Sequence, residues 1–207
     1  NRDADAYREI TIENDIVTSA EGSSRVKIGS TQVIAGVKLG VGKPFPDTPD
    51  EGVLMVAAEF LPLASPEFEN GPPGEQAIEL SRVVDRAIRE SKAIDFSKLC
   101  IAPKEKVWMV YVDIDIIDDD GNLIDAASLA AVSALLSARM PELDEENSVV
   151  EGTKTSKGLP MEGKPVSNTF VKINGRIVAD PKAEEMSALD ARLTIGSLDK
   201  NGFMLCS

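Results

Sequence analysis

The sequence predicts an α+β protein in which helices pack on an antiparallel or mixed β-sheet. About seven to nine short segments alternate apolar and polar residues or are rich in β-branched side chains, which is typical of strands. Two longer stretches, residues 75–92 and 126–140, have the apolar spacing of helices. Most strand segments follow one another through short turn sequences, and this favours hairpins packed against a few helices.

The first half of the chain is expected to hold most of one sheet. Strands are predicted at four segments, residues 7–13, 24–29, 31–39 and 52–60. Proline lacks a backbone donor, so the proline-rich residues 41–51 and 61–74 are predicted as loops. The strands at 31–39 and 52–60 are candidate sheet edges for contact with another subunit. The helix over residues 75–92 has one apolar face, made of Ala77, Leu80, Val84, Ala87 and Ile88.

A long strand is predicted over residues 106–118. Asp113 and Asp115 fall on one of its faces, and the opposite face is apolar, with Trp108, Val110, Val112, Ile114 and Ile116. The acidic residues 118–122 form a tight turn in which Gly121 supplies the positive φ. This turn is not a calcium loop, because no glutamate follows at the distance that would close one.

The helix over residues 126–140 is apolar nearly all round, which predicts a central buried position. Asp125 is predicted as its N-cap. The remaining elements are a loop over 143–165, a hairpin with strands 166–173 and 176–179 around Asn174-Gly175, a short acidic turn at 181–186, and a last hairpin with strands 191–197 and 203–206 around residues 199–202. We expect one domain over residues 1–207, with both termini incomplete, since the chain begins on Asn1 and ends in an apolar strand-like run.

Composition excludes several classes of function. The 207 residues carry a formal net charge of -13 and include no histidine. Ser-His-Asp and Cys-His catalytic arrangements are therefore absent, and two cysteines without a CxxC pair do not suggest a zinc site. We expect no metal and no cofactor. No apolar run reaches the ~20 residues of a membrane span, and the acidic balance argues against DNA binding. A soluble cytoplasmic protein is expected.

Three arginines stand out against this acidic background. Arg82, Arg86 and Arg89 are spaced by four and then three residues, which places them on one face of the predicted helix and off its apolar face. Guanidinium groups suit phosphate or carboxylate ligands. A structural alternative remains open on the residues alone: Glu79 precedes Arg82 by three residues and Asp85 precedes Arg89 by four, so acidic neighbours could neutralise the arginines.

Four segments together resemble the RNase PH family, and within it the non-catalytic type of subunit of the archaeal exosome. The segments are residues 44–52, 61–66, 82–92 and 118–129, and the resemblance extends from about Tyr7 to the end of the chain. It implies an RNase PH-like fold (the ribosomal protein S5 domain 2-like fold) built of βαβ-type halves. It also implies a hexameric ring in which this subunit alternates with a catalytic RNase PH-type partner, with RNA-binding cap proteins on the ring.

The same resemblance assigns roles to individual residues. Arg82 and Arg86, with Arg89 on the same face, match arginines that contact the backbone of single-stranded RNA. Asp125 stands where catalytic members hold phosphate, and a carboxylate there would repel an anion. Asp180 matches the first of two catalytic aspartates, but Met186 takes the second position, so Asp180 is interpreted as a turn former.

The resemblance therefore implies a non-enzymatic subunit that binds RNA and supports its partner in phosphate-dependent 3′-to-5′ RNA degradation. Two alternatives are a self-sufficient phosphorolytic 3′-exoribonuclease and a pure ring scaffold whose arginines bridge to partner carboxylates without touching RNA. Turnover by the purified chain would favour the first alternative. Loss of the ring on reversing the arginine charges would favour the second.

Overall fold

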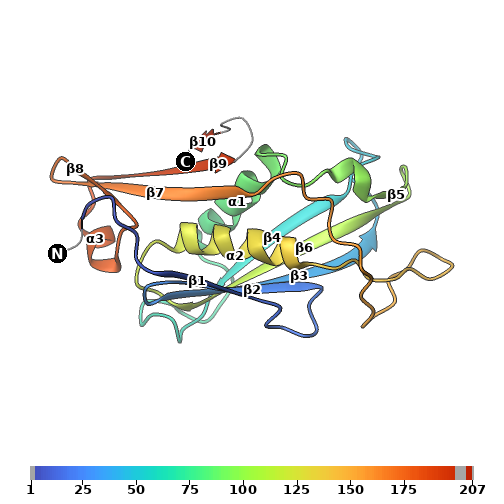
Figure 1. Ribbon diagram of the computed structural model, residues 1–207, viewed down its shortest axis with the longest axis horizontal. Helices are drawn as coiled ribbons and strands as arrows, with labels where there is room; N and C mark the ends of the chain where they lie inside the picture. Colours follow the sequence, from blue (N-terminus) through green and yellow to red (C-terminus); the bar gives the residue numbers. More distant parts are fainter. Residues whose placement is uncertain (1–2, 199–203, 207) are drawn as a thin grey trace.

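The computed structural model describes residues 3–198 and 204–206, which form two β-sheets with helices between them (Figure 1). The elements are β1 (Ile10–Asn14), β2 (Gly22–Ile28), β3 (Thr31–Gly42), β4 (Val53–Phe60), α1 (Glu75–Glu90), η1 (Phe96–Leu99), β5 (Cys100–Ala102), β6 (Lys106–Asp118), α2 (Leu123–Ser137), β7 (Pro165–Ile173), β8 (Arg176–Ala179), α3 (Ala183–Ser187), β9 (Ala191–Leu198) and β10 (Met204–Cys206). The predicted α+β class is confirmed.

The first sheet has the strand order β1-β2-β3-β6-β4, with β5 added beside β6. Neighbouring strands are antiparallel except β4 and β6, which run parallel, so the sheet is mixed. The predicted edge at residues 52–60 is confirmed as β4. The predicted edge at residues 31–39 is wrong, because β3 pairs with β2 on one side and with β6 on the other. The five residues of the predicted apolar face of β6 are all buried.

Helix α2 lies between the two sheets, as Figure 1 shows, and this position explains why it is apolar nearly all round. Small residues let it approach the first sheet closely: a Cβ at Gly22 of β2 would lie 2.3 Å from the carbonyl oxygen of Ala134. The predicted N-cap is wrong. The helix begins at Leu123, its N-cap is Asn122 with φ of 56°, and Asp125 lies in the first turn. The carboxylate of Asp125 instead contacts the second sheet.

The second sheet has the order β10-β9-β7-β8, all antiparallel, and covers the side of α2 opposite to the first sheet. The hairpin at Asn174-Gly175 is confirmed, with φ values of 48° and 79° that suit a two-residue turn. Most of the predicted acidic turn at 181–186 belongs to the short helix α3, which ends at Ser187. The predicted turn at residues 199–202 lies outside the described residues.

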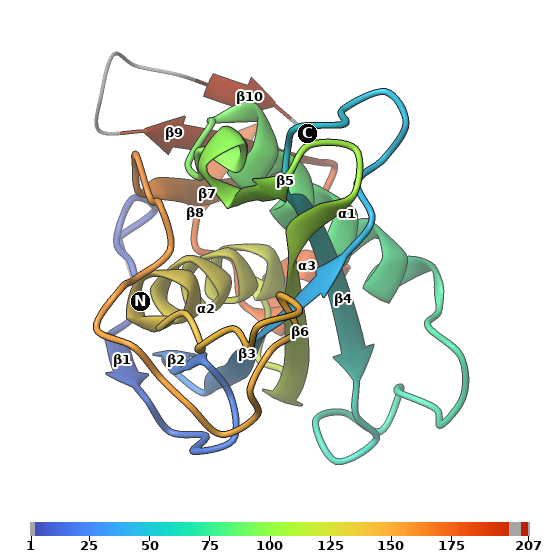
Figure 2. The same cartoon turned by 90° about the vertical axis from the view of Figure 1, so that its right-hand side faces the viewer.

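Helix α1 lies beside β4, at one edge of the first sheet, as Figure 2 shows. Its buried face includes the five predicted residues and also Val83. The outward face therefore carries the three arginines next to a sheet edge that no further strand covers among the described residues. Within the described part of the chain, no helix has the length and apolar character needed to cross a membrane.

Candidate functional site

Arg82 and Arg86 form an exposed pair on the outward face of α1. Neither side chain makes a hydrogen bond or ion pair with any described residue. They line a shallow recess of about 260 Å³ together with Val56 of β4, Ser81 and Asp85. Two permanently charged guanidinium groups thus stand free beside the edge of the first sheet. An arrangement of this kind can contact the phosphates of a nucleic acid without reading its sequence.

Arg89 shares the face but not the environment of the other two arginines. Its Nε and Nη2 donate to the two carboxylate oxygens of Asp85 at 3.1 and 2.7 Å, a bidentate pair. Nη2 also donates to the carbonyl oxygen of Leu54 in β4 at 3.1 Å. The guanidinium lies 5.8 Å from the ring centre of Phe96, within cation–π range. Arg89 thus connects α1 to β4 and is committed to partners within the chain.

Glu79 does not neutralise Arg82, although the two lie three residues apart on α1. Its carboxylate forms an ion pair with Arg192 of β9 instead. An acidic neighbour on the same helix therefore neutralises Arg89, and that neighbour is Asp85. Among the described residues, no such neighbour neutralises Arg82 or Arg86. Helical spacing alone could not separate these cases, because the partner of Glu79 comes from 113 residues further along the chain.

A cleft of about 470 Å³ opens at the N-terminus of α2, where α1, α3 and the second sheet meet the first. Its charged lining consists of Glu67, Glu79 and Asp119, with Arg192 already paired to Glu79. Asp119 accepts a hydrogen bond from the backbone N–H of Gly121 at 2.9 Å. Burial raises the pKa of Asp119, and the neighbouring carboxylates of Asp120, Asp118 and Glu67 raise it further. The Asp119 carboxylate thus occupies the backbone N–H of Gly121, which could otherwise donate a hydrogen bond to a bound anion.

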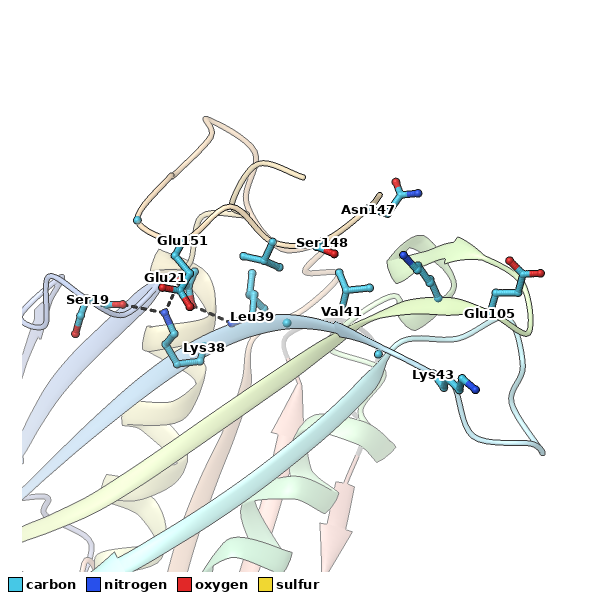
Figure 3. Close-up of a pocket in the computed structure, with 15 residues that line it drawn as sticks. Ser19, Glu21, Lys38, Leu39, Val41, Lys43, Glu105, Asn147, Ser148 and Glu151 are labelled. Atoms are coloured by element: carbon cyan, nitrogen blue, oxygen red, sulfur yellow. Dashed lines mark hydrogen bonds and ion pairs between the residues drawn. The ribbon is translucent and has the colours of Figure 1, made fainter. Parts of the chain in front are cut away.

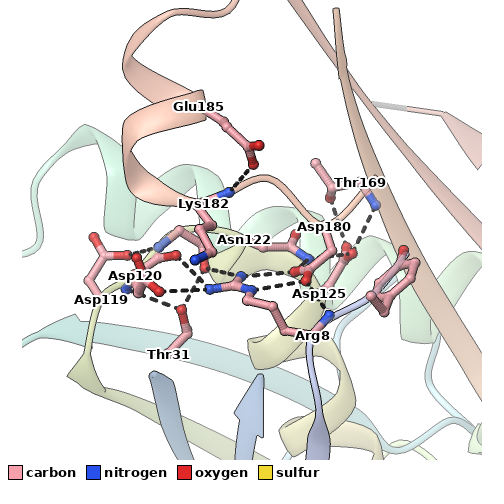
Figure 4. Close-up of polar contacts among 12 residues, drawn as sticks. Arg8, Thr31, Asp119, Asp120, Asn122, Asp125, Thr169, Asp180, Lys182 and Glu185 are labelled. Atoms are coloured by element: carbon pink, nitrogen blue, oxygen red, sulfur yellow. Dashed lines mark hydrogen bonds and ion pairs between the residues drawn. The ribbon is translucent and has the colours of Figure 1, made fainter. Parts of the chain in front are cut away.

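Asp125 is buried inside the junction between α2 and the second sheet (Figure 4). One oxygen accepts from the backbone N–H of Thr169 at 2.9 Å and from Nδ2 of Asn122 at 3.0 Å, and the other accepts from the Thr169 hydroxyl at 2.7 Å. Burial raises the pKa of Asp125 to about 6, against the opposing effect of these hydrogen bonds. The Asp125 side chain joins α2 to β7. It does not line the cleft, where it would have to lie to repel a bound anion.

Asp180 is fully buried and holds the N-terminal segment (Figure 4). Its carboxylate accepts from the backbone N, Nε and Nη2 of Arg8 at 2.8, 2.9 and 2.8 Å, and from Nδ2 of Asn122 at 2.8 Å. Burial alone would raise the pKa of Asp180, but the bonds from Arg8 outweigh it and the pKa is lowered. Asp180 has φ of 49°, so it does shape a turn. Arg8 lies 172 residues away, and no local pattern in the sequence indicates that it binds Asp180.

A second hollow, of about 780 Å³, lies at the far end of β3 from Thr31 (Figure 3). Lys38 and Glu21 pair at 2.7 Å on its floor, and Glu21 also accepts from the backbone N–H of Leu39 at 2.9 Å. Lysines and glutamates line it in balanced numbers, which does not indicate an anion or cation site. Among the described residues, no cluster of three or more Cys, Asp or Glu side chains is arranged to hold a metal ion.

Two stacked sheets around a buried helix, with a cleft at that helix's N-terminus, agree with the RNase PH-like class of protein that the sequence resemblance implies. The comparisons agree. A model of the 3′ exoribonuclease family, domain 1, matches residues 6–141, and the model of its domain 2 matches residues 163–205. The chain belongs to this 3′ exoribonuclease family, and the resemblance drawn from the sequence is confirmed.

Curated relatives are similar along nearly the whole chain. The exosome complex component Rrp42 of Methanothermobacter thermautotrophicus is 53% identical over 191 residues, which cover 92% of this chain and 70% of the relative. The protein of the same name from Aeropyrum pernix is 52% identical over 205 residues, which cover 98% of this chain and 74% of the relative.

Solved structures repeat the fold. A chain of the Archaeoglobus fulgidus exosome with RNA bound to the active site matches with a TM-score of 0.89 and 48% identity, covering 100% of this chain and 80% of that one. Rice Rrp46 matches with a TM-score of 0.72 at 17% identity, covering 100% of this chain and 83% of that one. The rice protein shows the shared fold alone.

Proposed function

We propose that this chain is a non-catalytic subunit of a hexameric exosome ring, in which it alternates with a catalytic RNase PH-type partner and contributes to binding single-stranded RNA. The observation that carries the proposal is the pair of exposed, unneutralised arginines, Arg82 and Arg86, on the edge of a chain with a net charge of -13. The relatives named as exosome components and the similar exosome chain solved with RNA support the assignment.

The chemistry of the cleft supports the absence of catalysis. Phosphorolysis needs a place for inorganic phosphate and ionised acids that face the reacting bond. Here the cleft is lined by carboxylates, and the N–H of Gly121 is taken by Asp119. Asp180 is buried under Arg8 and Asp125 under Thr169, so neither carboxylate is available to a substrate. The chain would then act by positioning RNA and by supporting the partner, in the cytoplasm and beneath RNA-binding cap proteins.

The test is a ring assembled from this chain and a catalytic RNase PH-type subunit. Changing Arg82→Glu and Arg86→Glu together should weaken the binding of a labelled single-stranded RNA roughly tenfold or more. The slope of log affinity against log salt should fall by about 0.7 for each lost phosphate contact. Arg176→Glu, at an exposed arginine of β8, is the matched control and should leave both quantities nearly unchanged.

Three other outcomes would contradict the proposal. RNA binding that is insensitive to both changes would remove the arginines from the interface. A ring that falls apart in the double variant would favour the scaffold alternative. Phosphate-dependent shortening of RNA by the purified chain without a partner would favour a self-sufficient exoribonuclease.

We also propose that residues 1–207 fold as a single unit, although two family models match successive parts of the chain. The support is physical, because α2 packs on both sheets and Arg8 joins the N-terminal segment to Asp180 beyond β8. One cooperative unfolding transition, with the same midpoint by far-ultraviolet circular dichroism and by Trp108 fluorescence, is the expected result. Two separated transitions would contradict it.

A further inference from the structure

We infer that Arg89 is a positioning residue that keeps Asp85 away from Arg82 and Arg86, and that it is not itself a ligand of RNA. The inference rests on the proposed function, since it concerns how the arginine face is kept cationic. Asp85 lines the same recess as Arg82 and Arg86 and would reduce the attraction of that recess for a phosphate.

Helix geometry makes Asp85 a potential partner of two arginines. Arg82 lies three residues before it and Arg89 four residues after it, and both spacings bring side chains together on a helix surface. The structure shows that Asp85 is paired with Arg89, through both carboxylate oxygens. The carboxylate is thereby neutralised and oriented toward the C-terminal end of α1, and Arg82 is left without an ion pair among the described residues.

Arg89 can hold this orientation because it is itself fixed from outside the helix. Its Nη2 donates to the Leu54 carbonyl on the free edge of β4, and its guanidinium lies over the ring of Phe96. A side chain already restrained by these two contacts loses little further freedom when it pairs with Asp85. Although 45% of the Arg89 side chain is exposed, its Nε and Nη2 already donate to partners within the chain. Arg89 therefore differs from Arg82 and Arg86 in its environment, although all three lie on the outward face of α1.

A double-mutant cycle between Arg89 and Asp85 separates the two roles. In the assembled ring, Arg89→Gln should weaken binding of a labelled single-stranded RNA roughly three- to tenfold, because Asp85 becomes free to pair with Arg82. Adding Asp85→Asn to that variant should restore most of the loss. In the otherwise unchanged chain, Asp85→Asn should have a smaller effect, since Asp85 is already neutralised there.

If Arg89 were a direct RNA ligand, the coupling would have the opposite sign. Asp85 would then compete with RNA for Arg89, so Asp85→Asn would strengthen binding in the unchanged chain and do little once Arg89 is gone. Either that pattern or a loss in Arg89→Gln that Asp85→Asn does not restore would overturn the inference. Arg89→Lys, which keeps the charge beside Asp85, should bind RNA better than Arg89→Gln.

Two further arms keep the result interpretable. Arg82→Gln should cost less affinity when Arg89 is already glutamine than in the unchanged chain, because Asp85 then already neutralises Arg82; an equal cost in both backgrounds would overturn the inference. Light scattering and thermal unfolding check that each variant still forms the ring. The proposed function is tested separately by the Arg82 and Arg86 charge reversals, so unaltered RNA binding there would reject the RNA-binding face itself, whatever the sign of the Arg89–Asp85 coupling.

Discussion

Replacing Asp180 by asparagine keeps the size of a fully buried side chain and removes its negative charge. The amide has a single acceptor oxygen, and its NH₂ group would face donors from Arg8 and Asn122 that now bond to a carboxylate. Asparagine tolerates the left-handed backbone that Asp180 adopts, with φ of 49°, so backbone strain adds little. The effect should therefore report the ion pair.

The expected loss follows from the burial of both partners, since the side chain of Arg8 is 8% exposed and that of Asp180 0%. Removing one partner of a buried pair costs about 3–5 kcal/mol. Summing the individual hydrogen bonds would overestimate the cost, because bonds within one network are not additive. For a chain of this size the loss corresponds to a melting temperature lower by roughly 6–20 °C.

The assay is urea unfolding of the purified protein, followed by circular dichroism, with the free energy compared at matched m-values. Asp190→Asn is the matched control: this carboxylate also accepts a backbone N–H, from Asn174 at 2.9 Å, but it is exposed. The control should lose less than about 1 kcal/mol. A similarly small loss for Asp180→Asn, with an unchanged m-value, would refute the argument that this ion pair anchors the N-terminal segment.

Two further predictions concern packing around α2. The pKa of Asp125 is about 6 in the folded chain and 3.8 in its ordinary state, so the folded state binds a proton more tightly than the unfolded state. The contribution of Asp125 to the free energy of unfolding should therefore fall by about 3 kcal/mol as pH rises from about 4 to 6. Asp125→Asn should flatten this pH dependence, measured by urea unfolding at stepped pH. A steeper slope in the variant would contradict the assignment. Gly22→Ala should destabilise the protein by roughly 2 kcal/mol or more, because the new Cβ would clash with Ala134 and Ala138. Gly36→Ala is the control and should be neutral or stabilising, because nothing lies within 4 Å of the new Cβ. Equal melting temperatures for the two variants would contradict the close packing of α2.

Much of the fold could be predicted because it follows local patterns. The alternation of apolar and polar residues in β6 and the turn at Asn174-Gly175 both depend on residues that are adjacent in the sequence. The structure has both as predicted. The place of β3 inside the sheet could not be predicted in this way, because strand order depends on pairing partners far along the chain. The short elements η1 and β5 have no periodic signal that distinguishes them from a loop.

The candidate site was predictable to the same extent. Helical spacing placed Arg82, Arg86 and Arg89 off the core, and the structure agrees. Their different partners could not be predicted, because the distinguishing contacts of Arg89 come from Leu54 and Phe96 on other elements. Spacing likewise suggested Asp125 as a helix cap, whereas its carboxylate is bound by a strand 44 residues later. The helix begins three residues earlier than the spacing suggested, and β7 binds the carboxylate that was expected to cap it.

The ion pair between Arg8 and Asp180 also affects when the N-terminal segment can fold during synthesis. The first strand leaves the ribosome early, but its anchor is translated 172 residues later, which at ~5–20 residues per second is a delay of roughly ten to thirty seconds. Throughout that interval the positive charge of Arg8 is without its buried counterion. The N-terminal segment can therefore settle only after Asp180 has emerged from the ribosome.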